Sequence, residues 1–170
     1  ENVFSESGEE LEAVVGGLLR QRKKSLAVAE SCSGGFLSHR LTNIPGSSDY
    51  FLEGLVTYSN EAKFDLLGVP MSLIQKHGAV SAPVAEAMAK GIKHRAQASY
   101  GLAITGIAGP TGATPEKPVG LVFTALAFGN KTKVERNLFL GKREQIKFQS
   151  TQKALDMLRR HLLKTGKKKY

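Results

Sequence analysis

The 170-residue sequence contains a single cysteine, Cys32, and no tryptophan. One cysteine excludes an internal disulfide framework and is typical of a reducing compartment. No CxxC, HExxH or paired-histidine spacing occurs, so we expect neither a structural nor a catalytic zinc ion. No apolar run reaches the roughly 18 residues of a membrane span, and no charged-then-apolar leader is visible. We therefore expect a cytoplasmic protein without a metal, another cofactor or a membrane partner.

Acidic residues are also few, because 15 Asp and Glu stand against 24 Lys and Arg, for a net charge of +9. Four of these nine charges come from lysines in the last seven residues: Lys164, Lys167, Lys168 and Lys169. We predict a solvated basic tail over residues 164–170. The other positive charges are scattered with few aromatic residues among them, which argues against a nucleic-acid partner.

Hydrophobic periodicity predicts a single domain over residues 1–163. Apolar residues at helical spacing predict helices over 8–22, 35–43, 60–68, 72–78, 81–98 and 142–163. Short apolar runs predict strands over 25–30, 50–59, 100–109, 119–129 and 133–141, the last two forming an antiparallel pair. Early strands alternate with helices and a hairpin follows, so we predict an α/β fold. Its form is a three-layer α/β/α sandwich with a mixed sheet, a late antiparallel hairpin and a C-terminal helix.

Three polar, glycine-containing loops follow predicted strands, at residues 31–35, 58–63 and 105–118. Ligands of open α/β sheets bind beyond the carboxyl ends of the strands. We therefore expect these three loops to gather at one edge of the sheet and to form the functional site there.

The motifs "AESCSGG", "VTYSNEAK", "HGAVS", "TGIAGPTG", "PEKPVG" and "GKREQIKFQ" follow one another in this order. In this respect the sequence resembles the CinA C-terminal domain family over roughly residues 8–163. The resemblance implies an amidohydrolase of pyridine nucleotide salvage, which converts nicotinamide mononucleotide to nicotinic acid mononucleotide and ammonia. It also implies a homodimer. The opening "ENVFS" resembles the junction after the N-terminal domain of longer CinA proteins, so we expect a piece of a longer chain.

The resemblance also implies a Ser–Lys catalytic dyad, formed by Ser31 and Lys63. A lysine that acts as a base must be neutral, so its pKa must fall from about 10.4 toward neutrality. Burial would lower this pKa, and so would a place in the first turn of a helix that Asn60 caps. Tyr58 is expected to donate to the leaving group or to hold Lys63.

Ser33 stays open as an alternative nucleophile, or as a group that positions the substrate. Cys32 is a stronger nucleophile than either serine, but neighbouring side chains of extended backbone point in opposite directions. We therefore interpret Cys32 as buried packing. None of the four histidines, His39, His77, His94 and His161, has an obvious acidic partner, which weakens a Ser-His-Asp interpretation.

Further residues are expected to bind the substrate. The backbone N–H groups of Ser33, Gly34 and Gly35 are predicted donors to the oxyanion, and Glu30 is predicted to orient a partner or to bind a ribose hydroxyl. The remaining expected contacts come from the glycine-rich loop and the last helix: Thr105, Gly106, Gly109, Gly112, Lys117 and Arg143. Of these, Lys117 and Arg143 are candidates for the phosphate.

The glycine-rich loop departs from the family at one position, because residue 113 is alanine where family members commonly carry glycine. Ala113 would be strained if the loop required a positive φ there. The loop also lacks the GxxxxGK[ST] order of a nucleoside triphosphate site, so we do not predict ATP binding. Two alternative functions stay open. One is a nucleic-acid-binding or competence- and DNA-damage-associated module, and the other is a catalytically degenerate nucleotide-binding domain.

Overall fold

The computed structural model describes residues 8–165 of the chain. Its elements in chain order are α1 (Leu11–Gln21), β1 (Leu26–Glu30), α2 (Phe36–Thr42), the short helix η1 (Ser47–Asp49), β2 (Phe51–Val56), α3 (Asn60–Leu67), α4 (Met71–His77), α5 (Ala82–Arg95), β3 (Tyr100–Gly106), β4 (Leu121–Phe128), β5 (Lys131–Leu138) and α6 (Arg143–Thr165). Every helix and strand predicted from the sequence is present.

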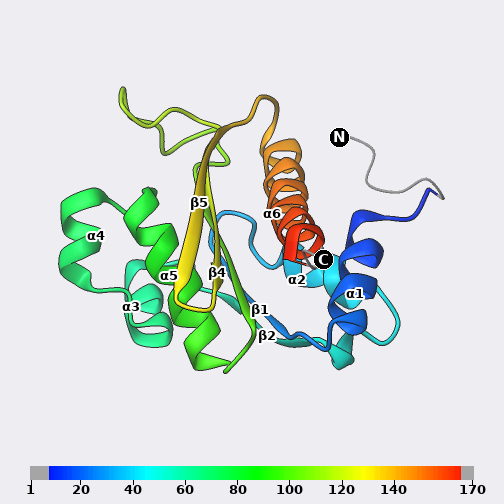
Figure 1. The fold of residues 1–170 in the computed structure, drawn as a ribbon. Coiled ribbons are helices and arrows are strands. Elements are labelled where there is room, and N and C mark those ends of the chain that lie inside the picture. The colour runs from blue at the N-terminus through cyan, green and yellow to red at the C-terminus, as the bar shows by residue number, and fades with distance from the viewer. Residues whose placement is uncertain (1–7, 166–170) are drawn as a thin grey trace.

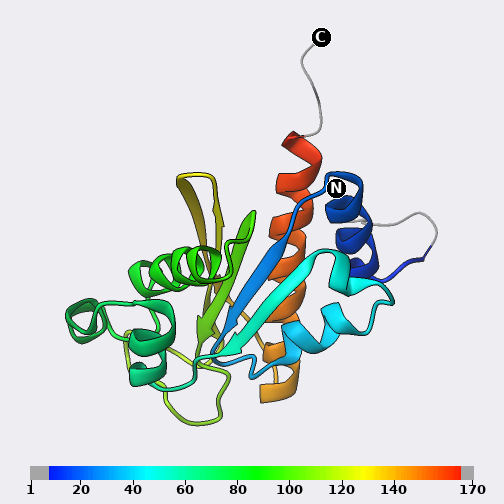
Figure 2. The same cartoon turned by 90° about the horizontal axis from the view of Figure 1, so that it is seen from below.

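The five strands form one mixed sheet in the order β2-β1-β3-β4-β5. β1 is parallel to both of its neighbours, whereas β4 is antiparallel to β3 and to β5. Helices α1, α2 and α6 cover one face of the sheet and α3, α4 and α5 the other (Figures 1 and 2). The predicted α/β/α sandwich with a late hairpin and a C-terminal helix is therefore confirmed.

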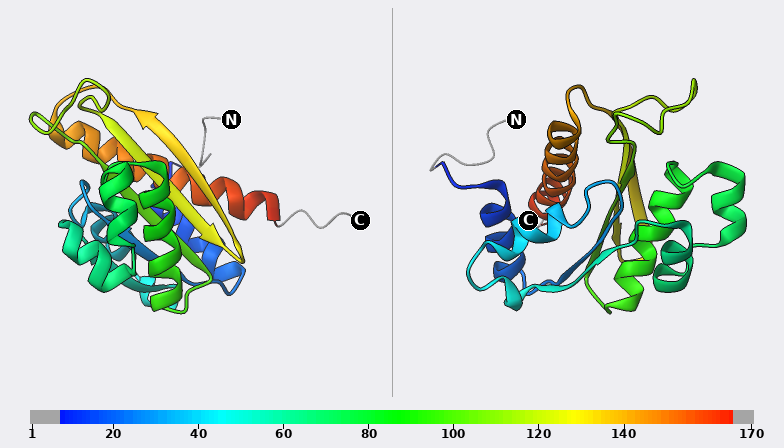
Figure 3. Two further views of the ribbon diagram at one scale, coloured as in Figure 1. Left: turned by 90° about the vertical axis from the view of Figure 1, so that its left-hand side faces the viewer. Right: turned by 180° about the vertical axis from the view of Figure 1, so that it is seen from behind.

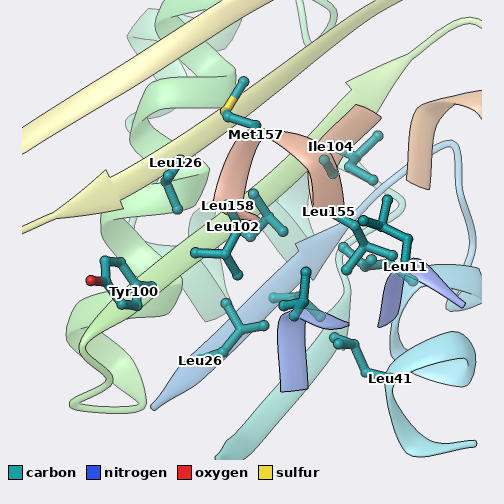
Figure 4. Packing of buried hydrophobic residues seen from close by; sticks show 14 of the residues in the cluster. Leu11, Leu26, Leu41, Tyr100, Leu102, Ile104, Leu126, Leu155, Met157 and Leu158 are labelled. Carbon is teal, nitrogen blue, oxygen red and sulfur yellow. The ribbon is translucent and has the colours of Figure 1, made fainter. Parts of the chain in front are cut away.

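The alternation of side chains along β1 explains why the molecule has two cores. Leu26 and Val28 pack into the core beneath α1, α2 and α6, where Figure 4 shows Leu26 among leucines of several elements. Ala27 and Ala29 face the other core, which α5 covers. Small residues on that face let α5 approach closely, since a Cβ on Gly101 of β3 would clash with the carbonyl oxygen of Ala89.

Element boundaries differ from the predictions at a few functional positions. β2 ends at Val56 and β3 at Gly106, earlier than predicted, because the following residues turn toward the site described below. Ser59, rather than Asn60, caps α3, and its side chain accepts a hydrogen bond from the N–H of Ala62. α6 continues through Thr165, so Lys164 belongs to this helix and not to a tail. The rest of the predicted tail lies outside the described residues.

α6 runs along one face of the sheet, as both views of Figure 3 show. Its apolar stripe is buried as predicted, at Ile146, Leu155, Leu158 and Leu162. Within residues 8–165, neither α6 nor any other helix combines the length and the apolar character that crossing a bilayer requires.

Candidate active site

The direction of the strands brings five segments to one edge of the sheet. β1, β2 and β3 are parallel and end there, at Glu30, Val56 and Gly106. β4 is antiparallel to β3 and therefore begins at the same edge, and β5 returns to it. α6 begins at Arg143, shortly after the end of β5 at Leu138. The first turn of α6 and the loop before β4 therefore both lie at this edge (Figure 1), where Arg143 contacts Gly109. The predicted gathering of the three loops is confirmed.

A pocket of about 280 Å³ opens at this edge, close to the lower limit of about 300 Å³ for ligand pockets. The side chains and backbone that line it are those of Ser31, Cys32, Tyr58, Lys63, Ala79, Val80, Thr105, Gly106, Ile107, Ala108, Gly109, Thr111, Gly112 and Arg143. Arg143 supplies a positive charge at this lining, Lys63 is a second basic residue, and none of the lining residues is acidic. The pocket is therefore suited to a small ligand that carries negative charge.

Ser31 and Lys63 are in direct contact at the base of this pocket. Lys63 Nζ lies 3.2 Å from Ser31 Oγ, within hydrogen-bonding distance. The same nitrogen also donates to the backbone carbonyls of Thr57, Tyr58 and Ser59, at 2.8, 3.2 and 3.4 Å. A neutral amine has two N–H groups and one lone pair. It can therefore donate hydrogen bonds to two of these carbonyl oxygens and still accept the proton of the Ser31 hydroxyl.

Lys63 is almost completely buried, with 1% of its surface exposed. Burial lowers the pKa of its ammonium below the usual 10.5, because the charged form loses its hydration. Within the described part of the chain, no carboxylate forms an ion pair with Lys63. Both observations favour the neutral amine, which is the form that a general base requires.

The structure distinguishes the three candidate nucleophiles of the 31–35 loop. Ser31 borders the pocket beside Lys63. Ser33 is fully buried and does not line the pocket, and its Oγ has no hydrogen-bond partner among the described residues. Cys32 belongs to the core, as predicted, and burial raises the pKa of its thiol to about 12. Ser31 is therefore the hydroxyl that the lysine can activate.

Glu30 does not line the pocket, and the structure gives its carboxylate partners other than the predicted ribose or catalytic group. Its fully buried carboxylate accepts hydrogen bonds from the N–H groups of Leu37 and Ser38, at 2.9 and 2.8 Å, and from Ser38 Oγ at 2.7 Å. It thus satisfies two N–H groups of the first turn of α2, which have no partner within the helix. Its role is to fix the turn that carries Ser31.

This role predicts that Glu30→Gln lowers the free energy of unfolding by about 1–3 kcal/mol, because an amide cannot accept all three hydrogen bonds. Ser38→Ala removes only the side-chain donor and is expected to cost less, about 1 kcal/mol. Urea unfolding of both variants measures the difference. Unchanged stability of Glu30→Gln together with weaker ligand binding would instead support the ribose contact.

The predicted oxyanion donors also need correction. The N–H of Gly34 already donates to the Ser31 carbonyl oxygen at 3.0 Å, and neither Ser33 nor Gly35 lines the pocket. Cys32 lines the pocket, and its N–H donates no hydrogen bond to another residue of the described chain. Since it directly follows Ser31, it is the available donor closest to the nucleophile along the chain.

Tyr58 and Arg143 meet at the rim of the pocket. Tyr58 is 61% exposed, so it is not a core residue, and its hydroxyl accepts a hydrogen bond from Arg143 Nη2 at 3.1 Å. Arg143 Nη1 donates to the carbonyl oxygen of Gly109 at 2.6 Å. Tyr58 holds Lys63 through its backbone carbonyl, while its hydroxyl proton stays free to donate into the pocket.

The glycine-rich loop supplies one wall, as predicted for Thr105, Gly106, Gly109 and Gly112. Thr105 Oγ1 does not face a ligand, because it donates to the carbonyl oxygen of Ala79 at 2.9 Å. This bond ties the Ala79–Val80 segment to the end of β3. Sequence analysis did not identify that segment as part of the site because it joins two helices rather than following a strand.

Lys117 lies away from its predicted position, and the condition for strain at Ala113 is not met. Lys117 Nζ donates to the carbonyl oxygen of His77 at 2.6 Å and does not line the pocket, so the structure does not place it at a phosphate. Ala113 is not among the described residues with positive φ, whereas its neighbour Gly112 has a φ of 91°. The alanine is therefore compatible with the loop conformation.

No histidine lines the pocket within the described residues, which leaves the Ser-His-Asp arrangement without a base. His161 packs against Phe128 and Tyr100, with ring centroids 4.1 and 5.4 Å away. Across residues 8–165, His, Cys, Asp and Glu side chains form no cluster of three or more that could hold a metal ion.

Comparison with known proteins identifies the family. The family model described as the CinA C-terminal domain matches residues 8–162. The chain belongs to the CinA C-terminal domain family. A CinA-like protein of Geotalea daltonii is 52% identical over 161 residues, which are 95% of this chain and 39% of that protein. This CinA domain thus spans about two fifths of the length of such relatives.

Solved structures with competence-related names share the fold of this CinA domain. The competence damage-inducible protein A of Klebsiella pneumoniae superposes with a TM-score of 0.88 at 34% identity, covering 90% of this chain and 95% of its own. The competence/damage inducible protein CihA of Agrobacterium tumefaciens superposes with a TM-score of 0.87 at 37% identity, covering 95% and 99%. These names do not specify a reaction.

Proposed function

We propose that this CinA domain is a metal-independent amidohydrolase, which converts nicotinamide mononucleotide to nicotinic acid mononucleotide and ammonia. The observation that supports the proposal most strongly is the contact between the buried Lys63 amine and Ser31 Oγ, in a pocket without an acidic side chain. The substrate itself is inferred from the family resemblance. Its carboxamide would lie at the base of the pocket and its phosphate nearer the rim.

In the first half of the reaction, Ser31 Oγ attacks the carboxamide carbon while its proton passes to Lys63 Nζ. The carbonyl oxygen becomes an oxyanion, for which the N–H of Cys32 is an available donor. Lys63 then returns the proton to the amide nitrogen. The C–N bond breaks, ammonia leaves, and an ester joins the nicotinoyl group to Ser31. Tyr58, with its hydroxyl proton free, is the proposed second donor to the leaving nitrogen.

In the second half, a water molecule attacks the ester carbon and Lys63 again accepts a proton. The bond between the carbon and Ser31 Oγ breaks, and the serine oxygen regains a proton from Lys63. The carboxylic acid that results loses its remaining proton, which the released ammonia takes up, and the product leaves as a carboxylate. Every atom released comes from the substrate and one water molecule. The reaction requires neither an oxidant nor a metal ion.

The direct test is the release of ammonia and nicotinic acid mononucleotide from nicotinamide mononucleotide, measured with the Cys32→Ala variant beside the wild type. We expect equal amounts of the two products. Cys32→Ala should keep kcat within about threefold, because the thiol is buried and protonated and only its backbone N–H is used. Hydroxylamine added during turnover should divert the nicotinoyl ester to a hydroxamate.

Binding of the mononucleotide without any ammonia release would contradict this function and favour a degenerate nucleotide-binding domain. Loss of activity in a folded Cys32→Ala variant would move the nucleophile from Ser31 to the thiol. The alternative of a nucleic-acid-binding or competence-associated module is supported by the net charge of the sequence and by the competence-related names of similar proteins, but four of the nine positive charges lie in the last seven residues.

A further inference from the structure

The segment that joins α4 to α5 forms one wall of the pocket, through Ala79 and Val80. The three carbonyl oxygens that precede Val80 accept hydrogen bonds from side chains rather than from backbone N–H groups. These bonds are Lys117 Nζ to the oxygen of His77 at 2.6 Å, Ser81 Oγ to that of Gly78 at 2.8 Å and Thr105 Oγ1 to that of Ala79 at 2.9 Å. Two of the three donors belong to β3 and the glycine-rich loop, so side chains hold two walls of the pocket together.

The backbone of Lys117 is fixed in a position from which its side chain reaches α4. Its N–H donates to the carbonyl oxygen of Thr114 at 3.1 Å, and its own carbonyl accepts from the Thr114 N–H at 2.9 Å. Gly78 leaves room for the ammonium, because a Cβ on Gly78 would lie 2.7 Å from Lys117 Nζ. His77 is the last residue of α4. A lysine at a helix C-terminus satisfies a carbonyl that has no partner within the helix.

Lys117 is half-buried and does not line the pocket, so it can influence a ligand only through the wall. Within the described residues its ammonium forms no ion pair, and the His77 carbonyl is its one hydrogen-bond acceptor. The N–H groups of Ala79 and Val80 donate no hydrogen bond to another described residue. The position of the wall therefore depends on the side chains that bind its carbonyl oxygens.

We propose that Lys117 is a positioning residue of the deamidation, which acts through the His77 carbonyl and holds the Ala79–Val80 wall in place beside the substrate. This inference rests on the function proposed above, because it assigns a further role in the same reaction. The wall lines the same pocket as Ser31 and Lys63. A shift of the wall by about 1 Å would let the carboxamide leave the line of attack, and misplacements of this size can lower a rate by about 100-fold.

The experiment measures steady-state deamidation of nicotinamide mononucleotide by the wild type, Lys117→Met, Lys117→Arg and Lys131→Met. Methionine keeps the length of the side chain without its donor, whereas arginine can still donate to the His77 carbonyl. The control Lys131→Met makes the same change at an exposed position where β5 begins. This position lies about 25 Å from the start of β4 at the site, since a strand rises about 3.4 Å per residue.

We expect Lys117→Met to lower kcat about 10-fold to 100-fold while KM stays within about threefold, because Lys117 does not touch the substrate. Lys117→Arg should keep kcat within about threefold of the wild-type value, and Lys131→Met should behave as the wild type. An unchanged kcat in Lys117→Met would overturn the positioning role. A raised KM with an unchanged kcat would overturn it as well, since Lys117 would then contribute to binding alone.

Amide hydrogen exchange, followed by NMR without substrate, tests the same contact independently of the reaction. The N–H of Gly78 donates to the carbonyl oxygen of Ile74 at 2.7 Å, at the end of α4. Exchange of this amide should be about tenfold faster in Lys117→Met and unchanged in Lys117→Arg and Lys131→Met. Faster exchange in a chain that releases no ammonia would retain the hold of Lys117 on the wall and reject the proposed reaction. Equal exchange in Lys117→Met and the wild type would reject this hold, even if deamidation is confirmed.

Discussion

Ser31→Ala and Lys63→Met are each expected to reduce kcat for deamidation by at least about 1,000-fold. The alanine removes the attacking oxygen. The methionine keeps the length of the buried side chain but has no lone pair on nitrogen to accept the hydroxyl proton. Because the two groups act as one unit, the double variant should lose little more than either single variant. Ammonia release from nicotinamide mononucleotide measures all three.

The pH profile tests the same dyad without a substitution. Burial lowers the pKa of Lys63 from its usual 10.5, so the neutral amine is present at a lower pH than in an exposed lysine. The neutral form is the active one, and kcat/KM should therefore rise with pH and level off above this lowered pKa. Below it, the rate should fall about tenfold per pH unit.

Two results would contradict the dyad. One is a folded Lys63→Met variant that keeps more than about a tenth of the wild-type kcat. The other is a wild-type rate that rises as the pH falls, since protonation would then activate the site. Circular dichroism of each variant must accompany the kinetics, because Lys63→Met also leaves the Thr57 and Tyr58 carbonyls without a donor.

The sequence pattern was sufficient to predict the layers of the fold and the gathering of the loops, and the family resemblance implied the central contact of the site. Parallel strands must end at one edge, so three polar loops that follow strands had to meet there, and Ser31 and Lys63 lie in two of them. Their proximity is confirmed by the structure, whereas their catalytic roles stay predictions. The proposed dimer likewise stays a prediction, because its test requires the oligomeric state in solution.

The parts that could not be predicted depend on tertiary contacts. Glu30 caps α2 from seven residues before Leu37, farther than an ordinary N-cap reaches, so no local pattern indicated the cap. The sequence around Lys117 likewise gave no sign of a partner for its ammonium group. Its Nζ donates to the carbonyl oxygen of His77, which is 40 residues away along the chain, and this contact separates Lys117 from the pocket.

The second large effect is expected for stability, at a buried ion pair that sequence analysis missed. Arg40 of α2 is 4% exposed and binds both carboxylate oxygens of Glu12 in α1, at 3.1 and 2.7 Å. It also donates to Thr151 and Gln152 of α6, each at 2.8 Å, and its guanidinium lies 5.1 Å from the Phe148 ring centroid. One side chain thus joins three helices on the same face of the sheet.

We expect Arg40→Met to lower the free energy of unfolding by about 3–5 kcal/mol, because it leaves the Glu12 carboxylate buried without its partner. Glu12→Gln leaves the guanidinium with two other acceptors and should cost less. The double variant should lose less than the sum of the two, since it removes both charges. Urea unfolding at neutral pH measures the three values, and strictly additive losses would show that the pair is not coupled.

The pH dependence of the Glu12→Gln effect gives an independent check of the pair. Burial alone would raise the pKa of the Glu12 carboxyl, but the hydrogen bonds and the charge of Arg40 outweigh it and hold this pKa below its usual 4.5. A carboxylate whose pKa is lower in the folded state stabilises the fold fully above its unfolded pKa. The stability difference between wild type and Glu12→Gln should therefore be constant at neutral pH and shrink as the pH falls below about 4.5 through the lowered pKa. A difference that stays constant down to acid pH would mean that the glutamate contributes through its shape and hydrogen bonds alone, without its charge.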